Sequence, residues 1–96
     1  MEYKPKSEDF SSIEISEDLE NLIEDISAKI HDAWAEKRMK NGWKYGSSYD
    51  NERKLHPCLV EYDKLTDEEK EIDRVTVIET IKTLLKLGYR IERGDK

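Results

Sequence analysis

Two stretches of the chain repeat their apolar residues with the period of an α-helix, whereas residues 42–65, roughly 24 residues that lie between the two expected helices, do not. The first stretch carries Leu19, Leu22, Ile23, Ile26, Ile30, Ala33 and Trp34, with its apolar stripe centred near Leu19, Ile26 and Ile30; the second carries Val77, Ile78, Ile81, Leu84 and Leu85. Both spacings keep one helix face apolar, and 96 residues suffice for one small domain. We therefore expect a mainly α protein of two long helices, with at most a minimal two-stranded β element.

The ends of both helices carry clear signals. Ser16 is placed as an N-cap, and Gly42 is a natural residue just beyond a helix end. Thr66 and Glu69 form a capping box at the start of the second helix, which Gly88 closes after Leu87. The sequence thus predicts one continuous helix from Ser16 to about Lys40 and a second from Thr66 to about Leu87.

The segments outside the helices differ in character. Residues 1–12 are polar, and we expect a flexible N-terminal arm there. The short alternations in residues 13–15 and 89–92 are candidates for a two-stranded ribbon. Residues 42–65 contain glycine, serine and four large aromatic side chains, which indicates an ordered aromatic loop with room for a short turn or hairpin near residues 45–49.

The charge of the chain excludes several functional classes. Charged residues make up 42% of the sequence, the net charge is −6 and the isoelectric point is near 5.0. A general nucleic-acid binder needs a basic face, so we expect no nucleic-acid partner. No apolar run approaches the length of a membrane helix and no signal peptide is visible, so we expect a cytoplasmic protein without membrane insertion.

Cations and aromatic residues form the most informative patterns. On the first helix, Trp34 and Arg38 follow Ser27 and His31 in one row, which is either the edge of the core or one wall of a pocket. On the second helix, Lys70 and Arg74 continue the apolar stripe inward. Buried cations need partners, which are either internal acids (Asp50, Glu61 or Asp63) or an anionic ligand or protein.

The loop between the helices interleaves aromatic and charged residues: Trp43, Lys44, Tyr45, Asp50, Arg53, Lys54 and His56. Such a set can stack a planar ring and contact its phosphate or carboxylate. It is equally typical of a protein-binding surface.

The sequence favours a protein that is not an enzyme. His31 and His56 lack metal-binding or catalytic spacings, and no phosphate-binding glycine motif occurs. Cys58 stands in an apolar stretch, where a buried structural thiol is expected. We expect no metal and no cofactor.

The chain closely resembles the RyR domain, the module repeated in ryanodine receptors. The resemblance rests on His31-Asp32-Ala33-Trp34-Ala35, Arg38, Gly42-Trp43-Lys44-Tyr45-Gly46, Asp50, Lys54-Leu55-His56-Pro57, Leu59-Val60, Tyr62, Leu65, Glu69-Lys70-Glu71, Asp73-Arg74 and Leu87-Gly88-Tyr89. It covers about residues 13–92, so we expect a RyR-like domain there, followed by a tail at 93–96.

The resemblance implies a small, mainly helical regulatory module. In the receptors such copies occur in tandem pairs on the cytoplasmic face of a calcium-release channel, whereas this chain holds one copy and no channel segment. Single prokaryotic copies imply a ligand-sensing role, with nucleotides as candidates.

The resemblance marks nine positions as a candidate ligand site: Trp34, Arg38, Trp43, Tyr45, Asp50, Lys54, His56, Lys70 and Arg74. In this hypothesis a tryptophan stacks on a small anionic ligand, the cations bind its anionic group, and Asp50 and His56 orient them. The alternative is a protein-interaction module, which pairs with another protein or a second copy of itself.

Overall fold

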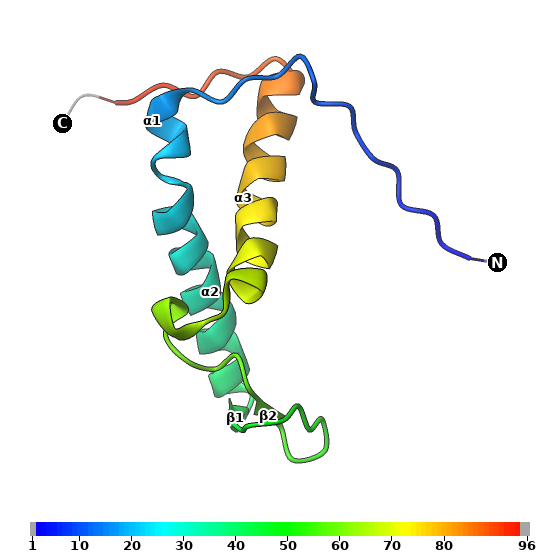
Figure 1. Ribbon diagram of the computed structural model, residues 1–96, viewed down its shortest axis with the longest axis vertical. Helices are drawn as coiled ribbons and strands as arrows, with labels where there is room; N and C mark the ends of the chain where they lie inside the picture. The colour runs from blue at the N-terminus through cyan, green and yellow to red at the C-terminus, as the bar shows by residue number, and fades with distance from the viewer. Residues whose placement is uncertain (1, 95–96) are drawn as a thin grey trace.

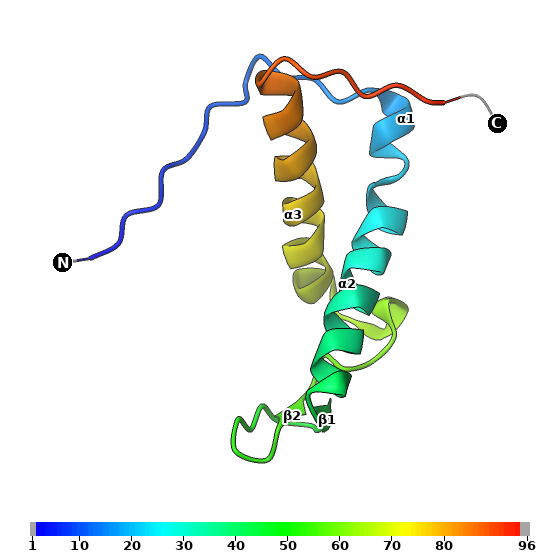
Figure 2. The ribbon, with the colours of Figure 1, turned by 180° about the vertical axis from the view of Figure 1, so that it is seen from behind.

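The computed structural model describes residues 2–94 and is dominated by two long helices that form a V (Figure 1). The elements in chain order are α1 (Glu17–Glu20), α2 (Ile23–Lys40), β1 (Lys44–Tyr45), β2 (Leu55–His56), a 3-10 turn η1 (Tyr62–Lys64) and α3 (Asp67–Lys86). The two long helices run in opposite directions, approach each other near the start of α3 and diverge toward α1 in both views (Figures 1 and 2). The prediction of a mainly α fold with two long helices is confirmed.

The first helix is interrupted, so the prediction of one continuous helix was wrong. Ser16 caps α1 as expected, because its Oγ accepts the Leu19 N–H at 3.3 Å. At Leu22 the backbone tightens into a turn whose N–H donates to the Leu19 carbonyl at 3.0 Å, and α2 begins one residue later. Glu20 and Glu24 lie four residues apart across this turn, a spacing at which like charges destabilise a helix.

The C-terminus of α2 ends in a Schellman motif. The Gly42 N–H donates to the Met39 carbonyl and the Trp43 N–H donates to the Arg38 carbonyl, both at 3.0 Å. This arrangement needs a left-handed backbone at Gly42, whose φ is +91°. Because the hydrogen bond from Trp43 to Arg38 joins the last and first residues of this motif, the two side chains lie next to each other.

The small β element lies in the loop rather than at the chain ends. β1 and β2 pair in parallel, with Lys44 opposite Leu55 and Tyr45 opposite His56. Glycine is required at position 46, since a Cβ there would stand 2.6 Å from the Leu55 Cβ.

The predicted ribbon between residues 13–15 and 89–92 was wrong. Both segments cross the open end of the V (Figures 1 and 2), but no backbone hydrogen bond joins them within residues 2–94. Side chains hold this end instead: the Lys86 ammonium lies 2.8 Å from the Glu8 carboxylate and 5.8 Å from the centre of the Phe10 ring. The division into an arm, a domain and a tail stays a prediction, and residues 1, 95 and 96 lie outside the described residues.

The core lies at the closed end of the V, where the segment from Leu59 to Leu65 packs across both helices. Its buried apolar residues are Trp43, Leu59, Tyr62, Leu65, Val77 and Ile81. On α2 the buried positions are Ser27 and His31, not the predicted apolar stripe. Its central residues Leu19, Ile26 and Ile30 are half-buried, and Leu22 is 45% exposed. Leu84 is also 39% exposed, because α3 diverges from α2 there.

The capping box of α3 gives a test of the local stability of the fold. The Thr66 Oγ1 accepts the Glu69 N–H at 3.2 Å, and the Glu69 carboxylate accepts the Thr66 N–H at 2.9 Å. We expect Thr66→Ala to lower the free energy of unfolding by about 1 kcal/mol, measured by urea denaturation.

Thr80→Ala is the matched control for this substitution. Among residues 2–94 the Thr80 hydroxyl bonds only to the Thr76 carbonyl of its own helix, a contact that does not stabilise helices. An equal loss in both variants would contradict a specific contribution from the cap.

Candidate functional site

The Arg38 side chain lies between two indole rings at the end of α2. Its guanidinium carbon is 4.6 Å from the centre of the Trp43 ring and 5.6 Å from that of Trp34. Trp34 precedes Arg38 by one helical turn, and the Schellman motif supplies Trp43. Within residues 2–94 no carboxylate pairs with Arg38, so its charge is held by aromatic faces and solvent.

His56 and Tyr49 complete this group of side chains. The His56 ring centre lies 4.9 Å from Trp34, 6.3 Å from Trp43 and 5.5 Å from Tyr49. The β1–β2 pairing positions His56 opposite Tyr45. We name the set Trp34, Arg38, Trp43, Tyr49 and His56 the Arg38 cluster.

The neutral His56 ring carries its proton on Nε2. Its Nδ1 accepts the Cys58 N–H at 3.0 Å and therefore holds a lone pair, which leaves Nε2 as the donor. Burial lowers the pKa of His56, and the nearby positive charge of Arg38 lowers it further. Near neutral pH the Arg38 cluster therefore presents a fixed cation beside a neutral hydrogen-bond donor.

A second group forms around Arg74, on the α3 side of the core. The Arg74 guanidinium donates to the Glu24 carboxylate and lies 3.5 Å from that of Glu71, while the Tyr62 hydroxyl donates to Glu24 at 3.1 Å. Lys70 lies over the Tyr62 ring at 5.3 Å. The partners of Arg74 are thus Glu24 and Glu71, not the acids Asp50, Glu61 or Asp63 considered from the sequence.

The ion pair of Arg74 sets the charge state of its partners. The hydrogen bond from Arg74 is the main cause of a lowered pKa at Glu24, and the same bond raises the pKa of Arg74. The charge of Arg74 is therefore paired internally with two carboxylates.

His31 connects the two groups. Its Nε2 donates to the Val60 carbonyl at 2.7 Å, and its ring centre lies 5.6 Å from Trp34 and 6.1 Å from Tyr62. Its Nδ1 is 4.0 Å from the Asp73 carboxylate, whose pKa burial raises. The sequence placed His31 in a row at the edge of the core or on the wall of a pocket; the structure buries it in the core.

The remaining predicted site residues organise the loop. The Asp50 carboxylate accepts the Arg53 N–H at 3.1 Å, and the Lys54 ammonium donates to the Asn41 carbonyl at the end of α2, at 2.9 Å. Tyr45 is 57% exposed beside them. Four of the nine predicted residues meet in the Arg38 cluster. The fifth member, Tyr49, was not among the predicted site residues, because no local sequence signal indicates its contacts.

Cys58 is held as a protonated thiol. Its Sγ–H donates to the Glu69 carboxylate at 3.0 Å, and burial is the main cause that raises its pKa to about 11. A thiol of this kind is a poor nucleophile near neutral pH, which favours a structural role.

The model of the RyR domain family matches residues 3–93, nearly the whole chain. The chain belongs to the RyR domain family. The match begins within the segment predicted as an arm, so the family pattern includes part of that segment. Within the described part of this RyR domain, no helix has both the length and the hydropathy needed to cross a bilayer. In the same residues, no three His, Cys, Asp or Glu side chains gather as a potential metal site.

The ion pair between Arg74 and Glu24 makes a pH-dependent contribution to stability. A carboxylate whose pKa is lowered by folding stabilises the protein above its ordinary value of 4.5, and this contribution is lost as the pH falls through the folded-state pKa. We expect Arg74→Ala to lower the melting temperature at pH 7, and the difference from wild type to shrink as the solution is acidified below 4.5.

Arg53→Ala serves as the control, because Arg53 is 80% exposed and lies 3.8 Å from Asp50. A difference between Arg74→Ala and wild type that persists unchanged at acid pH would contradict the assigned pair.

The charge of Arg38 should be visible in the titration of His56. We expect Arg38→Gln to raise the pKa of His56 toward its ordinary value of 6.5, because a nearby positive charge disfavours the imidazolium ion. NMR titration of the ring nitrogens measures this shift. Arg53→Gln removes a cation elsewhere in the loop and should leave the titration unchanged; an unchanged pKa in Arg38→Gln would refute the contact.

Proposed function

We propose that this RyR domain is a non-enzymatic regulatory module that binds a small anion with a planar part, such as a nucleotide, at the Arg38 cluster. The observation that carries the proposal is the position of Arg38 between Trp34 and Trp43 without a carboxylate partner in residues 2–94. An arginine stacked in this way keeps the donors at the edges of its planar guanidinium free. Phosphate and carboxylate groups accept two such parallel hydrogen bonds.

In this proposal the residues around Arg38 have different roles in binding the anion. Trp43 is only 8% exposed and therefore supports Arg38 from inside, whereas Tyr49 is 58% exposed and can stack on a planar ring. The His56 Nε2–H is a further donor for the ligand. Lys54 lies in the same loop and strengthens the positive field, while Arg74 is left out because Glu24 neutralises it.

The experiment is a thermal-shift titration with AMP, ADP, cyclic AMP and inorganic phosphate. A ligand that binds only the folded chain increases the free energy of unfolding by about 2.7 kcal/mol at a hundredfold excess over Kd, and therefore raises the melting temperature. We expect a saturable rise with at least one nucleotide. Arg38→Gln should abolish the rise, whereas Arg53→Gln, which removes the same charge from a more exposed side chain, should retain it.

Two results would count against this function. A melting temperature that no member of the panel changes removes the main support for an anion site. A rise that survives in Arg38→Gln places the ligand elsewhere.

A protein-interaction module is the second candidate. Tyr45 and Tyr49 are both more than half exposed on the loop beside Lys44 and Arg53, and tyrosine and arginine are enriched in protein interfaces. Light scattering after size exclusion, at several concentrations, tests self-association through this loop. The double substitution Tyr45→Ser and Tyr49→Ser should then shift the equilibrium toward the monomer.

A further inference from the structure

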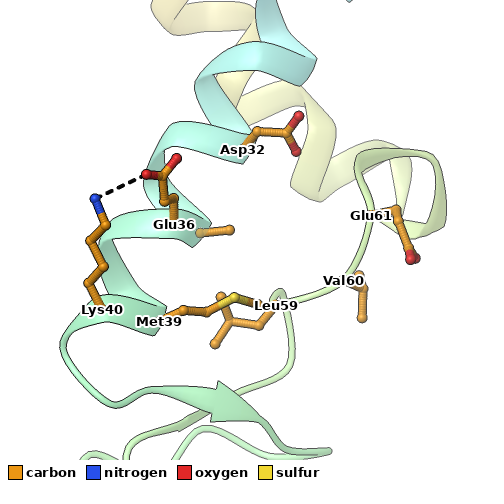
Figure 3. A pocket seen from close by; sticks show the side chains of 8 residues that line it. Asp32, Glu36, Met39, Lys40, Leu59, Val60 and Glu61 are labelled. Atoms are coloured by element: carbon orange, nitrogen blue, oxygen red, sulfur yellow. Dashed lines mark ion pairs between the residues drawn. The ribbon is translucent and has the colours of Figure 1, made fainter.

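A groove lies on the face of α2 next to the Arg38 cluster and contains none of its residues. It has a volume of about 590 Å³ and runs between α2 and the segment Leu59–Glu61. Its lining residues are Asp32, Ala35, Glu36, Met39, Lys40, Leu59, Val60 and Glu61. Figure 3 shows Asp32 and Met39 projecting from α2 toward this segment.

The groove combines an apolar floor with an acidic rim. Ala35, Met39, Leu59 and Val60 supply the floor, and Met39 is 55% exposed although it is apolar. Three carboxylates and one ammonium on the rim leave a formal charge of −2. Methionine adapts its shape easily and is common on surfaces that bind peptides.

The rim charges are not equally engaged. Glu36 pairs with Lys40 at 3.1 Å at one edge of the groove, as Figure 3 shows, and Glu61 pairs with Lys64 at 3.2 Å. Asp32 forms no ion pair within residues 2–94, and its carboxylate is exposed above the floor. Asp32 is therefore the carboxylate most available to an incoming cation.

We propose that this groove binds a segment of a partner protein in which an arginine or lysine stands next to an apolar residue. Both basic side chains have a long apolar stem and a charged end, which matches an apolar floor beneath a carboxylate. The stem lies against Met39 and Val60 and the charged end meets Asp32, while the neighbouring apolar residue fills the rest of the floor. The net charge of −6 of the chain attracts such a segment over a distance.

The proposal is independent of the anion site, since no residue of the Arg38 cluster lines the groove. It is tested with a blocked, fluorescein-labelled peptide of sequence Ser-Arg-Leu-Arg-Leu-Arg-Ser. One control peptide replaces the leucines with serine, and another replaces the arginines with glutamate. Fluorescence anisotropy at about 0.1 M salt, where exposed charges are partly screened, measures the affinity.

We expect the arginine–leucine peptide to bind more tightly than both controls. Asp32→Asn should weaken it about fivefold, the effect of one exposed ion pair of ~1 kcal/mol, and Met39→Gln should also weaken it. Asp25→Asn, the same change at an exposed position of α2 outside the groove, should leave the affinity unchanged. NMR shift changes on binding should centre on residues 32–40 and 59–61.

Four results would overturn the proposal. Binding of the serine and leucine peptides with equal affinity would show attraction by net charge alone. Equal affinity in wild type and Asp32→Asn, or absence of binding, would place no cation in the groove. Self-association of the wild type that Met39→Gln abolishes would assign the groove to a second copy of the chain.

Discussion

The stacking of Arg38 between Trp34 and Trp43 is the contact on which the arrangement of the aromatic loop at the end of α2 depends. It arises from the way α2 ends: the left-handed Gly42 turns the chain back, and the Trp43 N–H bonds the Arg38 carbonyl. The same turn starts β1, whose partner β2 carries His56 into the cluster. One helix terminus therefore determines both the path of the loop and the surroundings of its central cation.

Arg74 and Arg38 show two different ways in which this fold accommodates a guanidinium group. Arg74 meets the carboxylates of Glu24 and Glu71 and becomes part of the framework that joins α2 to α3. Arg38 meets only aromatic faces in the described residues, an interaction that orders the guanidinium without neutralising it. Chemical availability, more than position on a helix, separates a structural cation from a candidate ligand-binding one.

Helix α2 presents two surfaces of opposite character on neighbouring faces. Trp34 and Arg38 turn toward the aromatic loop, while Asp32 and Met39 turn toward the segment after Pro57. Residues 38 and 39 are separated by about 100° on the helix, so the cationic and acidic surfaces are close but distinct. The two proposals, a small anion at the Arg38 cluster and a basic segment in the groove, therefore concern separate faces of α2.

Local signals in the sequence determined the start of α1, the end of α2 and both ends of α3, because capping residues and positive-φ glycines act within a few residues. Ser16, Gly42, Thr66 and Gly88 serve as their positions predict, whereas no such signal marked the break between α1 and α2. Helix geometry and the family resemblance also predicted that Trp34, Arg38, Trp43 and His56 lie close together. The tertiary structure decided what depends on contacts between distant segments. These are the partner of Arg74, fifty residues away in the chain, the parallel pairing of β1 with β2, and the burial of His31 beneath Val60. No periodicity encodes such contacts, since they follow from how the loop packs between the two helices.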